Sequence, residues 1–396
     1  ASTANYPNVL ISDYLRETNQ ANPDVSRRAK AMMDVGYQRL VGYECPKTGL
    51  DGRTGFEWFG AKDQQHEALT AYGLLQFTDM ARVYPVDAAM LTRTKAYLLA
   101  ARDGKGGFTR NARALDTFGG APPAVTDAYI VWALTESEKG AAEPSDLTKE
   151  LDALFQRATT DGRPAKDPYY LSLTANALLN RGRQADAVKL LQAVAALQAK
   201  DGSIPGAETS ITSSRGRDLL IETTALASLG WLKANRNDLF HASLHNAMKW
   251  VGQQRGGSGS FGSTQSTILA LKALVEFARA NKRPAESGEL RIRVAGVEVG
   301  TKAFRTDTPG PITFEVPDPD GKFAAAGTEV EVETTAKQAY PLAVSWACRT
   351  RTPDSSPDCP VTLTTSLSKA ECAEGDTVRL ALAVENLRDA PHGMVV

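Results

Sequence analysis

The chain has 396 residues, of which 42% are hydrophobic and 23% charged, and its formal net charge is -1. This composition is typical of a folded globular protein, and the balanced charge argues against nucleic acid as a partner. No apolar run approaches the roughly 20 residues needed to cross a bilayer, so the sequence predicts no membrane segment. The length exceeds a typical core of about 100–200 residues, which predicts a large domain with a smaller one.

Apolar residues recur at helical spacing from the first residues to about Asn281, in segments separated by Gly-rich or Pro-rich breaks. The opening stretch already has the pattern of a helix, so we expect the chain to be a fragment of a longer protein. Five segments are especially rich in apolar and small residues: 67–77, 125–134, 170–179, 221–231 and 266–277.

A short turn of Gly followed by an aromatic or aliphatic residue precedes several of these segments. The turns are Thr54-Gly-Phe56, Gly106-Gly-Phe108, Asp201-Gly-Ser-Ile204 and Gly259-Ser-Phe261. Their recurrence predicts a repeated helix pair. The small-residue helices would line an inner ring, and more charged helices, such as 26–32 and 188–194, an outer one. The predicted fold class is mainly α, an α/α toroid, with an open helical solenoid as the alternative.

After Pro284 the pattern changes to alternating residues, which predicts β-strands at 290–295, 312–316 and 329–335. Two further strands are predicted within 360–367 and 376–387. The predicted organisation is a toroid over 1–284 followed by β segments over 285–355 and 356–396, the whole forming a smaller β-sandwich-like part.

Three of the four cysteines, Cys348, Cys359 and Cys372, lie near the end of the chain, and Cys45 lies alone in the helical part. Their spacing does not match a zinc site. Cys348 and Cys359 flank a loop that a disulfide could close, which indicates an oxidising compartment. The sequence has no Asn-x-Ser/Thr site, which favours a bacterial secreted or periplasmic protein.

Two sets of polar residues near the turn at Phe56 could carry chemistry. Asp63, His66 and Glu67 fall on one helical face with a spacing that suits a metal, although a polar helix N-terminus is the interpretation we favour. Glu57 with Asp63 could be the carboxylate pair of a glycoside hydrolase, since α/α toroids host such enzymes.

A second histidine pair, His241 and His245, stands four residues apart on a predicted helix, an offset that suits zinc. No third ligand completes the set, so we expect these histidines on a solvated outer face.

The opening stretch, together with Met33-Asp-Val-Gly-Tyr-Gln-Arg-Leu40, Trp58-Phe-Gly and Gly262-Ser-Thr-Gln-Ser-Thr267, resembles the thioester domain of the alpha-2-macroglobulin and complement family, and in particular its bacterial members. In that family a reactive Cys-Gly-Glu-Gln motif ends just before the position that matches Ala1. The resemblance therefore implies an internal Cys–Gln thioester immediately upstream of this chain. It also implies that 285–355 is part of a CUB domain and that 356–396 begins a macroglobulin-like, receptor-binding domain.

The resemblance implies a module of a broad-spectrum protease inhibitor in bacterial defence rather than a turnover enzyme. The intact protein would acylate proteases or other amine-bearing surfaces from the thioester, without a cofactor, in a secreted or periplasmic location. Its other partners would be the remaining domains of the parent. Asp116 matches the position of the transacylating His of complement, which would favour direct transfer to amines. The alternative function is a polysaccharide hydrolase or lyase that uses Glu57 and Asp63.

Overall fold

In the computed structural model, the described part of the chain as far as Ala280 consists mainly of helices. It describes residues 2–18, 23–45, 52–59, 65–111, 121–160, 162–257, 259–281, 286–306, 312–316, 328–337, 359 and 361–387. Within these ranges the α-helices are α1 Ser2–Glu17, α2 Pro23–Val41, α3 Glu67–Met80, α4 Ala88–Ala100, α5 Pro123–Ser137, α6 Thr148–Thr159, α7 Pro168–Asn180, α8 Gln184–Ala196, α9 Gly216–Ala234, α10 Asn237–Gln253 and α11 Thr264–Ala280. Two small antiparallel sheets follow, so the predicted fold class, mainly α with a smaller β part, is confirmed.

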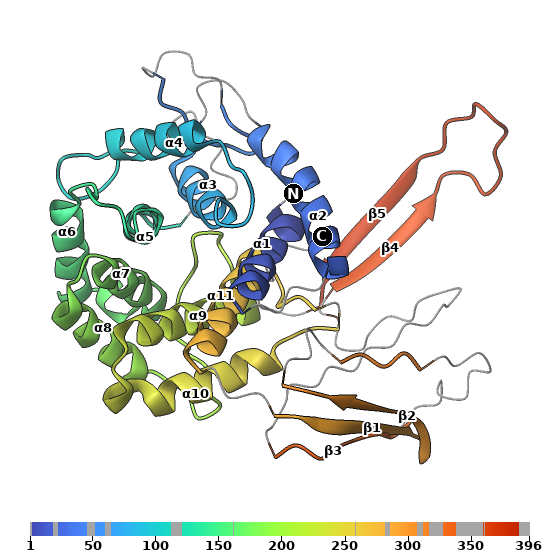
Figure 1. Ribbon diagram of the computed structural model, residues 1–396. Helices are drawn as coiled ribbons and strands as arrows, with labels where there is room; N and C mark the ends of the chain where they lie inside the picture. Colours follow the sequence, from blue (N-terminus) through green and yellow to red (C-terminus); the bar gives the residue numbers. More distant parts are fainter. Residues whose placement is uncertain are drawn as a thin grey trace.

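The helices form two concentric rings (Figure 1). The odd-numbered helices from α1 to α11 lie inside, and the even-numbered helices from α2 to α10 lie outside them. Each inner helix contacts the next one in chain order, and α1 contacts both α3 and α11. The ring is therefore closed, the predicted α/α toroid is confirmed, and the alternative of an open solenoid is wrong.

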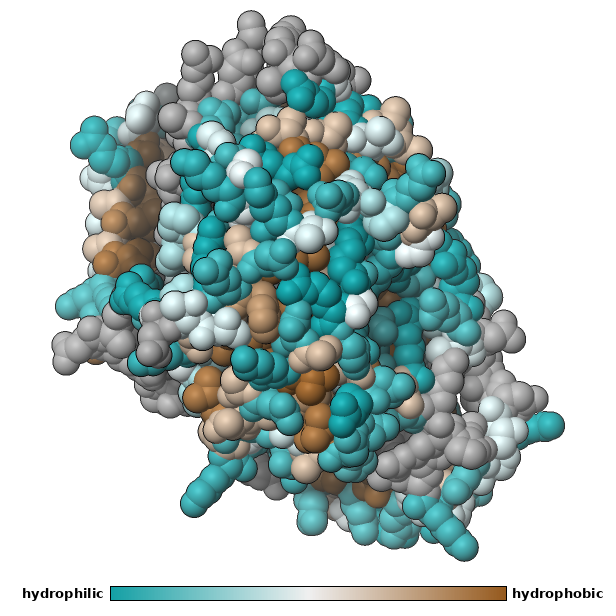
Figure 2. Space-filling view, turned by 90° about the vertical axis from the view of Figure 1, so that its left-hand side faces the viewer, coloured by the Kyte–Doolittle hydropathy of each residue, from teal (hydrophilic) through white to brown (hydrophobic). Residues whose placement is uncertain are grey.

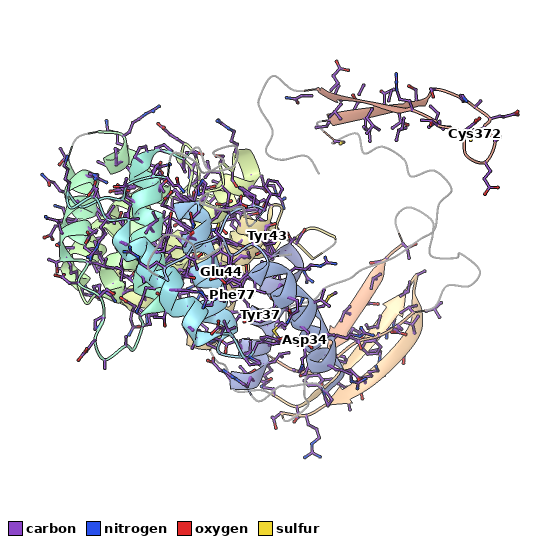
Figure 3. The ribbon with its side chains drawn as sticks, turned by 90° about the horizontal axis from the view of Figure 1, so that it is seen from above. Asp34, Tyr37, Tyr43, Glu44, Phe77 and Cys372 are labelled. Carbon is purple, nitrogen blue, oxygen red and sulfur yellow. The ribbon has the colours of Figure 1, made fainter. Side chains whose placement is uncertain are left out.

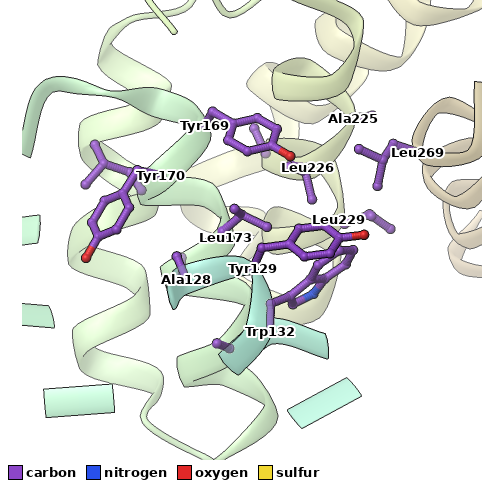
Figure 4. Close-up of a cluster of buried hydrophobic side chains, with 14 of the residues drawn as sticks. Ala128, Tyr129, Trp132, Tyr169, Tyr170, Leu173, Ala225, Leu226, Leu229 and Leu269 are labelled. Atoms are coloured by element: carbon purple, nitrogen blue, oxygen red, sulfur yellow. The ribbon is translucent and has the colours of Figure 1, made fainter. Parts of the chain in front are cut away.

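The inner helices α5 and α7 are buried on all their faces over most of their length, which explains their continuous runs of apolar and small residues. Every residue from 125 to 135 of α5 and from 168 to 178 of α7 is buried. Figure 4 shows Tyr129 and Trp132 of α5 beside side chains of α7 and α9. Ala128 and Ala225, in the same cluster, are both fully buried.

Outer helices are buried on one face only. In α6, Leu151, Leu154 and Ala158 are buried at helical spacing, whereas the other face carries charged residues. The side of the molecule that carries α6 and α8 is largely hydrophilic, with small apolar patches (Figure 2). The predicted outer segments 26–32 and 188–194 lie in α2 and α8, as expected.

The helix α2 joins the outer ring through aromatic contacts. Its Tyr37 ring meets Phe77 of α3 edge to face, at 6.0 Å between ring centroids, and lies 5.3 Å from Tyr84 (Figure 3). The Tyr37 hydroxyl also accepts a hydrogen bond of 3.1 Å from the amide of Asp87. These contacts position α2 against the first residues that follow α3.

The recurring turns of the sequence are hydrogen-bonded to four of the inner helices, α3, α5, α9 and α11. In each case the amide of the aromatic or aliphatic residue of the turn donates to a side chain of the inner helix that follows. The pairs are Phe56 to Thr70 at 2.9 Å, Phe108 to Asp127 at 3.3 Å, Ile204 to Thr224 at 3.0 Å and Phe261 to Thr267 at 2.9 Å. The aromatic or aliphatic side chain of each turn is itself buried. The repeat seen in the sequence is therefore a repeated connection from an outer to an inner helix.

Gly202, in one of these turns, is a position where only glycine fits. Its φ is +101°, and a Cβ there would lie 2.3 Å from the carbonyl oxygen of Asn246 in α10. We expect Gly202→Ala to lower the free energy of unfolding by about 1–3 kcal/mol, measured by urea denaturation. Gly140 is the matched control, since its φ is +76° with no atom within 4 Å of an added Cβ. Gly140→Ala should lower the free energy of unfolding by about 1 kcal/mol, which is the cost of placing an alanine in the left-handed conformation. Equal losses of stability in the two variants would show that α10 does not pack tightly against Gly202.

Ring closure depends on a buried carboxylate of α1. Asp13, only 5% exposed, forms ion pairs of 3.1 Å with Arg279 of α11 and 3.4 Å with Arg82, which follows α3. It also pairs with Arg16 at 3.1 Å. One carboxylate therefore joins the first, second and last inner helices.

We expect Asp13→Asn to lower the free energy of unfolding by about 1.5–3 kcal/mol, because Arg279 loses the one buried carboxylate among its three partners, Asp13, Glu17 and Glu276. Glu17→Gln is the control, since Glu17 pairs with the same arginine at 2.8 Å but is 45% exposed. Glu17→Gln should lower the free energy of unfolding by less than about 1 kcal/mol. Thermal and urea unfolding of the two variants would measure the difference, and a larger effect at Glu17 would contradict this account.

The first sheet contains β1 Gly288–Val294 between β2 Val297–Phe304 and β3 Val330–Thr334. The strands predicted at 290–295 and 329–335 are confirmed. The prediction of a strand at 312–316 is wrong, since these residues form no regular strand. They instead contact β2 through side chains: Lys302 donates to the carbonyl oxygen of Thr313 at 2.5 Å, and its ammonium lies 4.9 Å from the centre of the Phe314 ring.

The second sheet is a hairpin of β4 Val361–Leu367 and β5 Leu380–Asn386, which confirms the strands predicted there. Leu363, Leu367 and Leu382 are each more than 60% exposed. The domain boundaries at 284/285 and 355/356, and the assignment of the two β segments to CUB and macroglobulin-like domains, stay predictions.

Candidate functional site

A cavity of about 450 Å³ lies at the end of the toroid where four inner helices begin. Its wall includes Ser2 of α1, His66 just before α3, Asp218 of α9 and Thr264 of α11. The positive ends of the α3, α9 and α11 dipoles therefore face one space, which favours negative charge there.

Aromatic side chains make most of the remaining wall apolar. Tyr43, Phe56, Trp58 and Tyr72 line the cavity. Tyr43 and Trp58 are each 37% exposed, so they stand at the opening, whereas Phe56 is buried. A mostly apolar wall limits access of water to the space inside.

The first residues of the chain are held in this wall by hydrogen bonds. The Ser2 hydroxyl donates to Gln76 Oε1 at 2.8 Å and shares a short hydrogen bond with the Tyr72 hydroxyl. Thr3 and Thr264 meet at 2.7 Å between their hydroxyl oxygens. Burial raises the pKa of Tyr72 well above its ordinary value, so this phenol remains a hydrogen-bond donor or acceptor and carries no charge at neutral pH.

His66 caps α3, as the favoured interpretation of its sequence predicts. Its Nδ1 faces the amides of Ala68 and Leu69 at 3.2 and 3.4 Å, so this nitrogen acts as an acceptor. Among the residues that the structure describes, no group of three His, Cys, Asp or Glu is arranged to hold a metal. Asp63, the third member of the set predicted from the sequence, lies outside the described residues.

Glu57 is buried at the edge of the cavity, and its Oε1 accepts a hydrogen bond of 2.6 Å from the amide of Phe59. Its proposed catalytic partner Asp63 is outside the described residues, so the carboxylate pair stays a prediction. Asp116 and Cys348 also lie outside them. Cys359 is exposed, and the predicted disulfide between it and Cys348 stays a prediction.

His241 and His245 lie on the outer helix α10. Their ring centroids are 4.1 Å apart, and His245 Nδ1 lies 2.9 Å from the carbonyl oxygen of His241. His241 is exposed to solvent. His241 therefore occupies the solvated outer face that the sequence predicts, whereas His245 is half-buried, with its ring 5.2 Å from that of Phe277 of α11.

The sequence interpretation missed a set of hydroxyls on the far wall of the cavity. Thr212, Ser213 and Ser214 line it, and Ser214 Oγ donates to Glu222 Oε1 of α9 at 2.5 Å. Ser213 has a φ of +56°, which is uncommon for a residue other than glycine and indicates a constrained loop. Two signals were present: the run Thr209-Ser-Ile-Thr-Ser-Ser214, and the single charged residue, Glu222, within the otherwise uncharged segment 219–232.

Glu222 is fully buried, and its pKa is raised to about 8. Burial is the main cause, since it penalises the charged form, and the negative charge of Asp218 adds to it. The hydrogen bond from Ser214 and the nearby hydroxyl of Ser210 act in the opposite direction. The side chain is therefore a neutral carboxylic acid at pH 7, beside a cavity.

The opposite end of the toroid, where α5, α7 and α9 finish, holds a polar cavity of about 560 Å³. Lys139, Arg181 and Lys233 line it, and these cations face the negative ends of the helix dipoles. They are paired with Glu136 and Glu138. This cluster is explained by compensation of charge at the helix ends.

No helix in the described part of the chain combines the length and apolarity needed to cross a membrane. Residues 3–277 match the family described as A-macroglobulin TED domain. Ovostatin of Gallus gallus is 26% identical over 301 residues, which make up 72% of this chain and 20% of ovostatin. The chain thus spans about a fifth of the length of that curated relative. The family match covers most of the chain and coincides with the closed toroid, and we conclude that the chain belongs to the A-macroglobulin TED domain family.

Proposed function

We propose that this chain is the module of a macroglobulin-like protease inhibitor that holds an internal Cys–Gln thioester and presents it to amines. The observation that carries the proposal is the position of Ser2 and Thr3 in the wall of the cavity. A Cys-Gly-Glu-Gln motif immediately upstream of Ala1 would lie beside the same space.

The chemistry of the cavity suits an acyl donor of this kind. A thioester reacts readily because its leaving group is a thiolate, whose conjugate acid has a pKa of about 8.5. The apolar aromatic wall would protect it from water until an acceptor arrives. The surrounding helix N-termini would stabilise the oxyanion and the thiolate as negative charge develops.

The acceptors in this proposal are lysine side chains of proteases and other amine-bearing surfaces, and the protein acts outside the cytoplasm, secreted or periplasmic. It is an inhibitor module and not a turnover enzyme, and it uses no cofactor. Asp116, at the position of the complement histidine, would leave direct transfer to amines as the route. The exposed Trp58 and Tyr43 rings at the opening would meet other domains of the parent protein.

The test is the intact mass of the full-length parent with and without methylamine, combined with titration of free thiols. One adduct and one new thiol per chain are expected, and a parent whose upstream Cys is replaced by Ser should show neither. Absence of both in the wild type would contradict the proposal.

A further inference from the structure

We infer that Glu222 is a proton donor and acceptor for the acyl-transfer reaction, and that it reaches the cavity through the hydroxyls of Ser214 and Thr212. This inference deepens the proposed function and rests on it. The residues form a continuous path: Ser214 Oγ lies 2.5 Å from Glu222 Oε1 and 3.1 Å from Thr212 Oγ1. Thr212 and Ser214 both line the cavity, whereas Glu222 lies behind them.

The loop that carries the hydroxyls is held in place at several points. Ser210 Oγ accepts hydrogen bonds from the amides of Thr212 and Ser214, at 3.3 and 3.1 Å, and lies 3.1 Å from Thr212 Oγ1. The amide of Ile211 donates to the Tyr169 hydroxyl at 3.4 Å. The loop is therefore held in place by its own Ser210 side chain and by one contact from α7.

The surroundings of Glu222 keep it protonated. Tyr129 of α5 and Tyr169 of α7 face it, and Asp218 lies one turn earlier on α9. These groups are neutral phenols and a carboxyl, so none of them is a cation that would stabilise a carboxylate. Glu222 Oε2, fully buried, has no hydrogen-bond partner among the described residues. A purely structural glutamate at this depth would be expected to have both oxygens satisfied.

The proton balance of the reaction gives this acid a role. The amine nitrogen attacks the thioester carbonyl carbon, a C–N bond forms and the C–S bond breaks. The departing thiolate takes up one proton, and the amine nitrogen loses one. In our proposal the Glu222 carboxyl supplies the first proton through Ser214 and Thr212, and the resulting carboxylate recovers the second by the same path. The net reaction converts an amine and a thioester into an amide and a thiol, with Glu222 unchanged.

The test uses the full-length parent and follows thiol release with methylamine between pH 6 and 9, with rates expressed per unprotonated amine. We expect Glu222→Gln to slow release by about 100-fold, within the range for loss of a general acid–base group, and to abolish the inflection near pH 8. Ser214→Ala and Thr212→Val leave the carboxyl in place and should slow release similarly. They keep the inference testable if Glu222→Gln does not fold.

The matched control is Thr223→Val, one residue from Glu222 on α9. Thr223 is buried, and its hydroxyl donates only to the Leu219 carbonyl oxygen of its own helix, at 2.8 Å. This variant should react like the wild type. If the wild type reacts and the Glu222, Ser214 and Thr212 variants match it, the proton path is overturned and the proposed function stands. If the wild type releases no thiol, the proposed function fails and this inference falls with it.

Discussion

Replacing Glu136 by Ala should lower the free energy of unfolding by about 3 kcal/mol, the lower end of the range for breaking a buried ion pair, because the Glu136 side chain is only 12% exposed. Glu136, at the end of α5, accepts hydrogen bonds from Trp132 Nε1 at 2.9 Å and Asn180 Nδ2 at 3.0 Å. Lys139 pairs with it at 2.5 Å, and Lys233 of α9 does so at still closer range. Without the carboxylate, two ammonium groups remain close together at the end of three inner helices.

The pKa values of this cluster show how strongly its charges interact. Burial alone would raise the pKa of Glu136, but Lys233, Lys139 and Lys272 outweigh it and hold that pKa well below its ordinary value. Burial lowers the pKa of Lys233 to about 8 in spite of the attraction of Glu136. Loss of Glu136 would therefore leave Lys233 poorly able to carry its charge.

Urea denaturation at pH 7 would measure the loss, with Arg27→Gln as the control. Arg27 and Asp24 form an ion pair of 2.7 Å on α2, and both side chains are 78% exposed. Removing this pair should change stability by less than about 1 kcal/mol. Glu136→Gln, which keeps the shape and removes the charge, should resemble the alanine variant. An effect of Glu136→Ala no larger than that of Arg27→Gln would mean that the cluster contributes little to folding.

The toroid could be predicted from the sequence because its two signals are local. Helices buried on all faces need small and apolar residues throughout, as in 125–134 and 170–179. The turns into α3, α5, α9 and α11 each combine a glycine with a buried aromatic or aliphatic side chain. Gly202 illustrates the second signal, since its positive φ and the nearby Asn246 carbonyl both exclude a side chain. Closure of the ring was a weaker inference, because Asp13 and Arg279 that join its ends are 266 residues apart.

The hydroxyl path to Glu222 could not be predicted in the same way. Thr212 and Ser214 look like loop residues in the sequence, and only the close packing of α5, α7 and α9 makes the neighbouring carboxyl a buried acid. The wrong strand at 312–316 has a related cause. This segment does contact β2, but through the Lys302 side chain, which meets the Thr313 carbonyl oxygen and the Phe314 ring, and not through a backbone ladder. An alternating pattern of apolar and polar residues indicates which side chains face a surface. It does not indicate which backbone groups form hydrogen bonds with a neighbouring strand.

The buried acid at Glu222 should make the stability of the chain depend on pH. Its pKa is raised from an ordinary value of 4.5 to about 8 in the folded state, so the folded chain holds a proton that the unfolded chain has released between these pH values. The free energy of unfolding should therefore fall as pH rises through this window, by up to about 1.4 kcal/mol per pH unit relative to Glu222→Gln. Below about pH 4 Glu222 is protonated in both the folded and the unfolded state. The difference in the free energy of unfolding between the two proteins should then no longer change with pH.

Urea denaturation of the wild type and Glu222→Gln at pH 5, 6, 7 and 8 would measure this difference. The facing groups leave the comparison interpretable: Tyr129 and Tyr169 have raised pKa values and do not titrate in this range, and Asp218 is present in both proteins. Curves that stay parallel throughout would show that Glu222 is ionised in the folded state. A carboxylate there could not supply the first proton of the reaction, so this measurement on the chain by itself also bears on the proton path, independently of any thioester.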